Sequence, residues 1–327
     1  MTQVNILVGV AGSGKSTFIR DNIKANDIHL SSDNIRKELY GDLYQNDPKK
    51  VFNIMSERLF NAIDQNVNNI WYDATNISRK NRRTLYNSIK QYKNSVNVRI
   101  ICIFTSLPTI LKQNNLRTGL AKVPENVIKR MYFNLEVPRL TVDSDEIVVI
   151  NNSKNILLED LEYQYDDNHY SPYHHETITQ HIQWCIEHAK KTHNQKLIEI
   201  ATHHDNGKFI TQTDIENPDV ASQLVINQYG RHCQYIGHAN VGAMYYLANN
   251  YSNNSENNTD VLEITECIFQ HMNAHNGISK KNISNNKLTS SILQMIEQFA
   301  KIDDISRTVD ESLLQDYLAL KKVKQKT

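Results

Sequence analysis

One short segment near the amino end constrains this chain more than any other. The apolar run at residues 4–10 leads into GVAGSGKS at 9–16, which fits the pattern G-x-x-x-x-G-K-[ST]. Such a run is typical of a buried parallel strand, and a helix pattern begins near Lys15. In that context the glycines let successive backbone N–H groups surround phosphate oxygens, and the new helix end adds positive potential. The sequence therefore predicts a site for the phosphates of a nucleotide.

The residue types of this loop predict separate roles. Lys15 is expected to reach the β and γ phosphates, and the Ser16 hydroxyl to ligate Mg²⁺. ATP, or another nucleoside triphosphate, is the expected cofactor together with Mg²⁺. The alternative is a glycine-rich turn with a chance lysine, which average composition gives in roughly 1 % of chains this long. The expected nucleotide contacts are Gly9, Gly12, Ser13, Gly14, Lys15, Ser16 and Thr17.

Alternating strand and helix patterns continue through the first half of the chain. Apolar runs at 69–73, 96–104 and 147–150 predict further strands. Helix patterns lie at 51–66, 79–93, 106–115 and 124–136. This alternation predicts an α/β domain over residues 1–155, with a parallel sheet covered by helices on both faces.

The second half of the chain has a different pattern. Beyond about residue 152 the strand signals fade, and the acidic, aromatic stretch DLEYQYDDNHYSP marks a domain boundary between 152 and 170. The polar segments 252–259 and 279–286 are predicted loops. An all-α domain is therefore expected over residues 165–327. Its helix-period patterns lie at 176–192, 195–204, 238–250, 260–274 and 288–302.

Polar side chains follow the predicted strands of the first domain. Asp33 stands at an expected strand end, where its carboxylate could accept a hydroxyl proton and Arg36 could hold an anionic substrate. The alternative for Asp33 is an N-cap for a helix over 34–40. Asp73 ends the next strand and is expected at the same edge of the sheet. Arg117, in a glycine-containing loop, could close over the transferring phosphoryl group.

The segment SRKNRR at 78–83 forms a compact basic cluster. One interpretation is a binding patch for a polyanion. The other is a plain solvated start of the helix predicted at 79–93. The sequence leaves both interpretations open.

Four segments of the first domain together resemble a known family. GVAGSGKST, SSDNIRKEL, WYDATNISRKNRR and NNLRTGLAKVPENVIKRMY, in that order, are similar to the kinase domain of phage-type polynucleotide 5′-kinases over residues 1 to about 140. The resemblance implies ATP-dependent phosphate transfer to a 5′-hydroxyl of RNA or DNA. It implies Asp33 as general base and Arg36 as an acceptor-strand contact. It also implies Asp73 as an organiser of the site and Arg117 as a lid arginine on the donor phosphates.

Histidine is concentrated in the second half, where twelve of the thirteen histidines lie after residue 168. An isolated His-Asp pair would be a weak signal. An ordered series spread over helices is stronger, because imidazoles and carboxylates together suit one or two divalent metal ions. The other histidines, such as His188, His203, His232 and His275, are expected to pack rather than ligate. The series runs as His, His-Asp, His, His, Asp, with HHETITQH at 174–181, HD at 204–205, single histidines at 238 and 271, and DD at 303–304.

This series resembles the HD phosphohydrolase superfamily over about 170–310. The resemblance implies a core metal set of His181, His204, Asp205 and Asp303, extended by His238 and His271 toward a second metal. It also implies metal-activated water that attacks a phosphoester. Lys208 could bind the phosphate, and Asp304 is the rival of Asp303. Because such sites accept Mn²⁺, Fe²⁺, Ni²⁺, Co²⁺ or Zn²⁺, the choice of ion stays open.

Together the two domains predict a bifunctional nucleic-acid end-healing enzyme. It would phosphorylate 5′-hydroxyl ends of RNA or DNA, remove a terminal 3′, 2′ or 2′,3′-cyclic phosphate, and act with an RNA or DNA ligase. One alternative is a small-molecule kinase, for a nucleoside or sugar, joined to a nucleotide phosphohydrolase. The other is a non-catalytic sensor of nucleotide and metal.

Composition adds only broad limits. The 36 basic and 36 acidic side chains neither demand nor exclude a nucleic-acid partner. No run of eighteen apolar residues is present, and the four cysteines are scattered. A reduced, cytoplasmic protein of a bacterium or phage-infected cell, without a membrane partner, is the expectation. The oligomeric state is left open.

Overall fold

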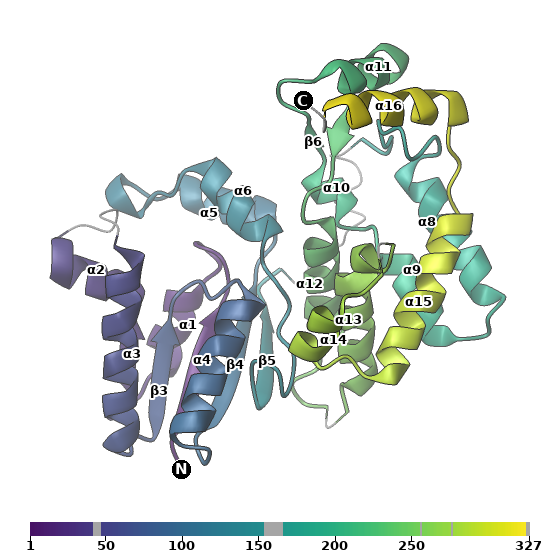
Figure 1. Cartoon of the computed structure of the whole chain (residues 1–327). Coiled ribbons are helices and arrows are strands. Elements are labelled where there is room, and N and C mark those ends of the chain that lie inside the picture. Colours follow the sequence, from purple (N-terminus) through teal and green to yellow (C-terminus); the bar gives the residue numbers. More distant parts are fainter. Residues whose placement is uncertain (42–46, 154–165, 256, 276, 325–327) are drawn as a thin grey trace. The chain divides into compact units, whose positions relative to one another are not determined.

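The computed structural model describes residues 1–41, 47–153, 166–255, 257–275 and 277–324, and Figure 1 shows its elements. The chain divides into two compact units. The first comprises Met1–Asn155, Leu247–Asn258 and Asn285–Lys287, and the second comprises Ile156–Tyr246, Thr259–Ser284 and Leu288–Thr327. In the described ranges, every helix is too short or too polar to cross a membrane. Most of the predicted boundary stretch, 154–165, lies outside the described residues.

The first unit is built on a five-stranded sheet in which all neighbours are parallel. The strand order is β2-β3-β1-β4-β5, so β1 lies in the middle with β3 and β4 on its two sides. In parallel sheets, ligands bind beyond the carboxyl ends of the strands where the order changes direction. The loop after β1 leaves the sheet at that place. The strands are β1 Gln3–Val8, β2 Ile28–Ser31, β3 Asn69–Asp73, β4 Asn97–Phe104 and β5 Glu146–Asn151.

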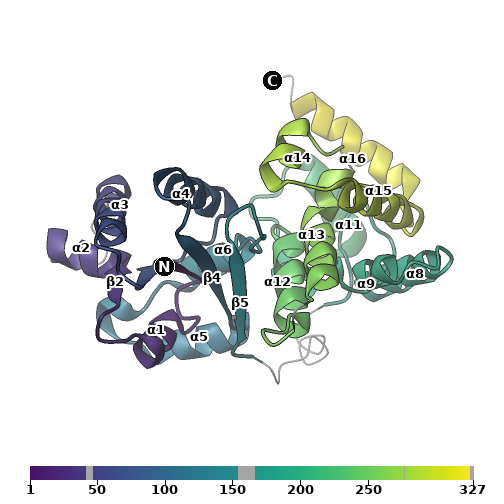
Figure 2. The ribbon, with the colours of Figure 1, turned by 90° about the horizontal axis from the view of Figure 1, so that it is seen from below.

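Helices cover both faces of this sheet. Figure 2 shows α3 and α4 on one face and α1 and α5 on the other. The predicted α/β fold is confirmed, and the apolar strands β1 and β4 are buried over most of their length and need cover on both sides. The predicted helix at 124–136 is shorter in the structure and ends at Phe133. The helices are α1 Lys15–Asn22, α2 Ser32–Tyr40, α3 Pro48–Asp64, α4 Arg79–Tyr92, α5 Leu107–Asn115 and α6 Glu125–Phe133, with a 3-10 turn at Gly119–Ala121.

The chain after residue 166 is mainly helical, as predicted. A two-residue antiparallel pair, β6 Thr213–Asp214 with β7 Cys233–Gln234, interrupts it. A helix at the end of the chain, α16, was not predicted and packs its Tyr317 with Ala221 and Val225 of α11. The helices are α8 Ile178–Lys190, α9 Gln195–His203, α10 Lys208–Thr211, α11 Val220–Tyr229, α12 His238–Asn250, α13 Thr259–Ala274, α14 Lys280–Asn286, α15 Ser290–Ile305 and α16 Glu311–Lys324.

The predicted loop at 279–286 is wrong, because α14 occupies most of it. This helix buries none of its side chains, so it leaves no apolar period in the sequence. Its start is instead stabilised locally, since the Ser279 hydroxyl accepts a hydrogen bond from the backbone N–H of Asn282 at 3.2 Å.

One face of α8 positions the site of the second unit. Its buried residues are Ile178, His181, Cys185 and Ala189, which recur every three or four positions. Polar and apolar side chains thus share a single buried stripe. Because a buried imidazole without partners would cost free energy, the stripe needs polar groups opposite it.

Candidate phosphate and metal sites

The loop after β1 has the backbone shape of a phosphate cradle. Gly12 and Gly14 adopt left-handed φ values of 89° and 98°, which residues with a Cβ rarely adopt. The Lys15 ammonium donates hydrogen bonds to the carbonyl oxygens of Gly9 at 2.7 Å and Val10 at 2.9 Å. The buried Ser13 hydroxyl has no hydrogen-bond partner among the residues that the structure describes. An unpartnered hydroxyl and an ammonium at the start of a helix fit a phosphate ligand.

Charged groups from three other segments surround Lys15. Burial lowers the pKa of Lys15 to about 8, while the carboxylates of Asp73 and Asp33 act in the opposite direction. The positive charge of Arg117 also lowers this pKa. An Arg117 guanidinium nitrogen lies 4.0 Å from the place where a Cβ on Gly12 would stand. Two carboxylates and a guanidinium therefore act electrostatically on the Lys15 ammonium of the phosphate loop.

Asp33 is not the helix cap that one interpretation predicted. The N-cap of α2 is Ser31, whose hydroxyl accepts a hydrogen bond from the Asn34 N–H at 3.4 Å, so the helix begins two residues earlier than expected. Asp33 lies in the first turn with 68 % of its side chain exposed. Arg36 donates to the Asp33 carboxylate at 2.7 Å. The Asp33 carboxylate is therefore open to solvent at the edge where the strands end.

Asp73 is held by a histidine that the sequence analysis did not select. Asp73 ends β3 and is buried, and His29 on the adjacent strand β2 places its Nε2 3.1 Å from the carboxylate Oδ2. The parallel pairing of β2 with β3 brings these two side chains together. A signal was present, since His29 is the only histidine before residue 168 and precedes an expected strand end.

Both interpretations of the basic cluster at 78–83 fail for its two central arginines. Arg79 and Arg82 are buried, so they form neither a polyanion patch nor a solvated helix start. The Arg82 side chain and its ion-pair partner Asp143 are fully buried, and the two join at 2.8 Å. Arg79 donates to the carbonyl oxygen of Val137 at 3.0 Å. These arginines fix the connection before β5 to the start of α4.

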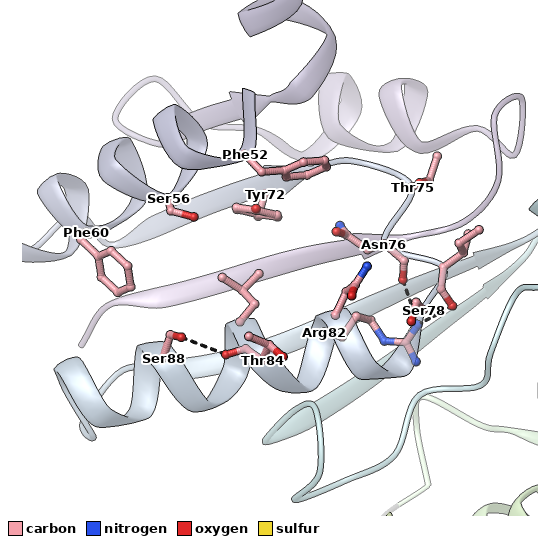
Figure 3. A pocket seen from close by; sticks show the side chains of 13 residues that line it. Phe52, Ser56, Phe60, Tyr72, Thr75, Asn76, Ser78, Arg82, Thr84 and Ser88 are labelled. Carbon is pink, nitrogen blue, oxygen red and sulfur yellow. Dashed lines mark hydrogen bonds between the residues drawn. The ribbon is translucent and has the colours of Figure 1, made fainter. Parts of the chain in front are cut away.

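A cavity of about 470 Å³ lies between α3 and α4, beside the end of β3 (Figure 3). Phe52 of α3 and Tyr72 of β3 are among its lining residues, and Thr75 and Asn76 line it just after Asp73. Phe52 is 36 % exposed. The cavity is therefore an aromatic-lined space next to the strand end that carries Asp73.

Hydrogen bonds fix the protonation of four buried imidazoles in the second unit. In each ring Nδ1 faces a backbone carbonyl, and because a carbonyl only accepts, Nδ1 must carry the proton. Each Nε2 then presents a lone pair unless a second proton binds. The Nδ1 bonds run from His181 to Ser306 at 3.1 Å, His204 to Ala201 at 3.0 Å, His238 to Tyr235 at 2.8 Å and His271 to Ile268 at 2.7 Å.

The Nε2 atoms of these rings face one another in two pairs. His181 and His204 place theirs 3.3 Å apart, and His238 and His271 place theirs 3.2 Å apart. Two facing lone pairs repel unless a positive charge lies between them. A divalent cation is one group that supplies such a charge, and imidazole nitrogens are common metal ligands.

Asp205 lies between the two pairs. Its Oδ2 is 3.5 Å from the His181 Nε2 and 3.4 Å from the His204 Nε2. Its Oδ1 is 3.5 Å from the His238 Nε2 and 3.8 Å from the His271 Nε2. One carboxylate therefore reaches both imidazole pairs, each with a separate oxygen, as a bridging ligand would.

The structure separates the two neighbouring aspartates of α15. The buried Asp303 places Oδ1 3.0 Å from the His181 Nε2. Asp304 has 51 % of its side chain exposed and pairs with Arg307 instead. His275 stays outside the imidazole pairs and contacts the other oxygen of Asp303 at 2.9 Å. Among the described residues, the groups suited to a metal contain Asp303 and not Asp304.

The carboxylates divide the four rings into two electrostatic classes. Burial disfavours charge on His181, yet its hydrogen bond to Asp303 contributes to a pKa raised to about 9. Burial also opposes charge on His204, but Asp205 helps to raise its pKa well above the usual value. Burial and the nearest rings lower the pKa of His271 to about 3. The first pair therefore favours a positive charge more strongly than the second.

A cluster of four polar side chains, Lys208, His169, His174 and Glu176, borders these imidazole pairs. The Lys208 ammonium lies 2.7 Å from the Asp205 Oδ2 and 3.1 Å from the His169 Nε2. Burial opposes ionisation of Glu176, but hydrogen bonds that include one from His174 lower its pKa to about 2. His169, His174 and Glu176 together could hold a cation or line a substrate. The sequence analysis named neither His169 nor Glu176 as a site residue, although both lie just before α8.

The remaining histidines lie outside these groups in the described part of the chain. His188 contacts the Ser306 hydroxyl at 3.0 Å, and His203 contacts the Asn206 side chain at 3.1 Å. His232 packs edge-on against Tyr317. Each of these three side chains therefore contacts a neighbouring residue in the described part of the chain.

Comparison with known proteins places only the first part of the chain. An AAA domain family model, AAA_33, matches residues 4–138, which include β1 to β4 and the phosphate loop. No curated protein matches the chain. The phosphate loop and the parallel sheet therefore belong to a P-loop type of α/β fold.

Three solved structures share limited similarity with the chain. A chain of a Pnkp1/Rnl/Hen1 complex is 23 % identical, with a TM-score of 0.31 over 38 % of this chain and 41 % of that one. A chain of the Pnkp1/Rnl/Hen1 RNA repair complex is 20 % identical, with a TM-score of 0.35 over 41 % and 44 %. A gluconokinase from Sinorhizobium meliloti 1021 is 18 % identical, with a TM-score of 0.29 over 46 % and 83 %. The match thus spans less than half the length of either chain from the two complexes.

Proposed function

We propose that this chain is a two-centre enzyme that repairs the ends of broken nucleic acid. The first unit transfers phosphate from ATP to a 5′-hydroxyl, and the second removes a terminal 3′, 2′ or 2′,3′-cyclic phosphate. The observation that carries the proposal is that each unit contains a cluster of side chains suited to bind and react with phosphate. Asp33, Asp73 and Arg117 act electrostatically on Lys15 in one unit, and two imidazole pairs lie around Asp205 in the other.

The kinase step follows from the groups around Lys15. Lys15 and the loop N–H groups hold the β and γ phosphates, and the Ser13 hydroxyl gains the partner that it lacks. Asp33 accepts the proton of the acceptor hydroxyl as its oxygen forms the new bond to the γ phosphorus and the bond to ADP breaks. Arg117 binds the oxygens of the transferring group, where negative charge must be balanced.

Two further groups complete the proposed kinase centre. Ser16 is placed at the start of α1 to hold Mg²⁺, which neutralises phosphate charge when bound. His29 fixes Asp73 at the strand end, so Asp73 can orient groups on the loop. Arg36, already bonded to Asp33, can turn to an acceptor phosphate, because its partner is exposed.

The cavity beside β3 favours a nucleoside as the acceptor end. Its volume of about 470 Å³ is in the range of small-ligand pockets. Phe52 and Tyr72 offer aromatic faces on which a base can stack. The same space could accept a free nucleoside, so the small-molecule kinase remains the second candidate. The exposed Asp33 carboxylate, to which Arg36 is bonded, favours a longer acceptor, since a strand can lie across an open edge.

The hydrolytic centre would use the two imidazole pairs. His181, His204 and Asp303 are suited to hold one divalent ion, His238 and His271 a second, and Asp205 both. When bound, such ions supply positive charge and an acidified water for attack on phosphorus. The buried Lys208 ammonium can bind a phosphoryl oxygen next to Asp205, and His174 can orient the leaving end.

The test uses an RNA oligomer with a 5′-hydroxyl and a 3′-phosphate, ATP labelled at the γ position, and Mg²⁺ with Mn²⁺, Co²⁺, Ni²⁺ or Zn²⁺. Lys15→Ala is expected to abolish label transfer and leave phosphate release intact. Asp205→Ala is expected to do the reverse. The exposed lysine Lys37 supplies a matched control, because Lys37→Ala should change neither reaction.

The acceptor class is decided by competition. Label on the oligomer at low concentration, with free nucleosides and sugars unlabelled, supports the end-healing enzyme. Label only on free nucleosides or sugars supports the small-molecule kinase. No label on either class contradicts the kinase proposal, and bound metal without turnover of any phosphoester supports a sensor. A DNA oligomer of the same sequence decides between RNA and DNA, and addition of a ligase reports whether the healed ends can be joined.

A further inference from the structure

A cysteine lies inside the proposed metal centre. Cys185 stands one turn after His181 on the buried face of α8, and it is fully buried. Its Sγ is 3.7 Å from the His181 Nε2. One donor atom from each of His181, Cys185, His204 and Asp303 lies within 4.8 Å of the other three. The Cys185 sulfur is therefore one of the possible ligand atoms around the first imidazole pair, His181 and His204.

The size and shape of this cluster suit one ion. Zinc bonds of about 2.0–2.3 Å in a tetrahedron separate neighbouring donors by roughly 3.5 Å. The His181 Nε2 is 3.3 Å from the His204 Nε2, 3.0 Å from the Asp303 Oδ1 and 3.7 Å from the Cys185 Sγ. The donor atoms come from three helical segments and all four side chains are buried. The cluster is thus a compact cage of two nitrogens, one oxygen and one sulfur.

The position of the other cysteines makes Cys185 distinctive. Cys102, Cys233 and Cys267 are also buried. Within the described ranges, none of these three belongs to a group of side chains that could hold a metal. Burial alone therefore does not explain why Cys185 lies among two imidazoles and a carboxylate.

We propose that Cys185 is a thiolate ligand of the first metal and that it makes this position select a thiophilic ion, such as Zn²⁺ or Co²⁺, over Mg²⁺ or Mn²⁺. The inference rests on the proposed hydrolytic centre. On binding, the S–H bond breaks, its proton passes to solvent and the sulfur forms a bond to the cation. Soft sulfur donors favour zinc-like ions, whereas magnesium and manganese prefer oxygen.

This assignment divides the two metal positions by role. With Cys185 added to His181, His204 and Asp303, and with the shared Asp205, the first position would receive all of its ligands from the chain. The second receives three, Asp205, His238 and His271, and leaves a position for water or substrate. A water for hydrolysis would therefore fit the second position, and the first position would help to hold the shared Asp205 in place.

The experiment loads the full chain with Co²⁺ and records its absorption spectrum. The wild type is expected to show a thiolate-to-cobalt charge-transfer band in the near ultraviolet. Cys185→Ser should lose this band and Cys233→Ser, the matched control, should keep it. Competition with Mn²⁺ should show that Cys185→Ser has lost at least ten-fold of its preference for Zn²⁺. If Cys185→Ser does not fold, Cys185→Ala and X-ray absorption of the wild-type zinc protein, with one sulfur neighbour expected, give the same decision.

Each outcome separates this inference from the proposed function. Cobalt that binds without a sulfur band, or a band that persists in both Cys185 variants, overturns the role of Cys185 and leaves the metal centre standing. A wild type that binds no cobalt, zinc or manganese overturns the metal centre itself. The band in the wild type together with its loss in Cys185→Ser supports both.

Discussion

The phosphate loop and the histidine cluster, for both of which we propose phosphate chemistry, are built from different parts of the chain. The loop uses backbone amides of consecutive residues, shaped by two glycines with left-handed φ values. The cluster uses side chains that come from α8, the end of α9, and the helices α12, α13 and α15. A site made of backbone amides is specified by one short stretch of sequence. A site made of side chains from several helices forms only after the helices pack. The difference predicts how each unit responds to mutation.

The largest expected effect comes from the buried ion pair of the first unit. Arg82→Met would leave the fully buried Asp143 without its partner and lower the free energy of unfolding by about 3–5 kcal/mol. The control is Arg58→Met, whose partner Glu38 is half-exposed, so its cost should be under about 1 kcal/mol. Denaturant unfolding checks this prediction. Nucleotide binding reports the folded fraction of the first unit, and metal binding reports that of the second. Equal effects of the two variants would contradict the role given to burial.

The next effect concerns the turn that joins Asp205 to α10. A Cβ on Gly207 would stand 2.0 Å from the carbonyl oxygen of His238, so Gly207→Ala must push the start of α12 away. We expect a loss of about 3 kcal/mol in unfolding free energy and weaker metal binding, with kinase activity kept. In the control Gly230→Ala the new Cβ meets no atom, so only the left-handed φ is strained, by about 1 kcal/mol. Calorimetry that found equal midpoints would contradict the steric argument.

A third prediction separates the neighbouring aspartates. Asp303→Asn should weaken metal binding and slow phosphate release by about 100-fold or more, because Asp303 faces His181. Asp304→Asn should change either by less than about two-fold, since Asp304 pairs with Arg307 on the surface. Elemental analysis and phosphate release measure both. The reverse ranking would show that α15 presents its other face to the imidazoles.

The smallest effect tests a supporting contact of the phosphate loop. His29→Phe removes the contact to Asp73 but keeps the ring, and we expect about a ten-fold fall in the kcat of label transfer with little change in the KM for ATP. His29→Gln, which can still donate a hydrogen bond, should recover most of the rate. An unchanged rate in His29→Phe would mean that Asp73 needs no partner.

Much of the fold was predictable because its signals are local. The motif of the phosphate loop and the apolar runs at 69–73 and 96–104 each predict their structure from a few consecutive residues. The structure shows β3 at Asn69–Asp73 and β4 at Asn97–Phe104. The elements that were predicted wrongly lack such a local sequence signal. The helix α14 buries no side chain, and the cap at Ser31 was hidden because Asp33 is an equally good capping residue.

The candidate site was less predictable. Sequence order supplied the histidines and aspartates, but not which of them meet. The choice between Asp303 and Asp304 depends on a rotation of about 100° around α15, where Phe299 and Ile302 mark the buried face. Cys185 could have been noticed, because it stands four residues after His181 on one helix face. Only packing shows that its sulfur meets donors from α15 and the end of α9.

Three of the four rings in the imidazole pairs are tied to the carbonyl three residues earlier in their own stretch of chain, at Ala201, Tyr235 and Ile268. Main-chain atoms are common to every residue type, so the side chains at Ala201, Tyr235 and Ile268 can change without removing the carbonyl oxygen that orients each ring. A single inserted or deleted residue in any of those turns would move the Nε2 of one ring away from its partner ring. We therefore expect the imidazole pairs to keep their geometry when these three carbonyl-bearing residues are substituted, and to lose it when a residue is inserted or deleted in their turns.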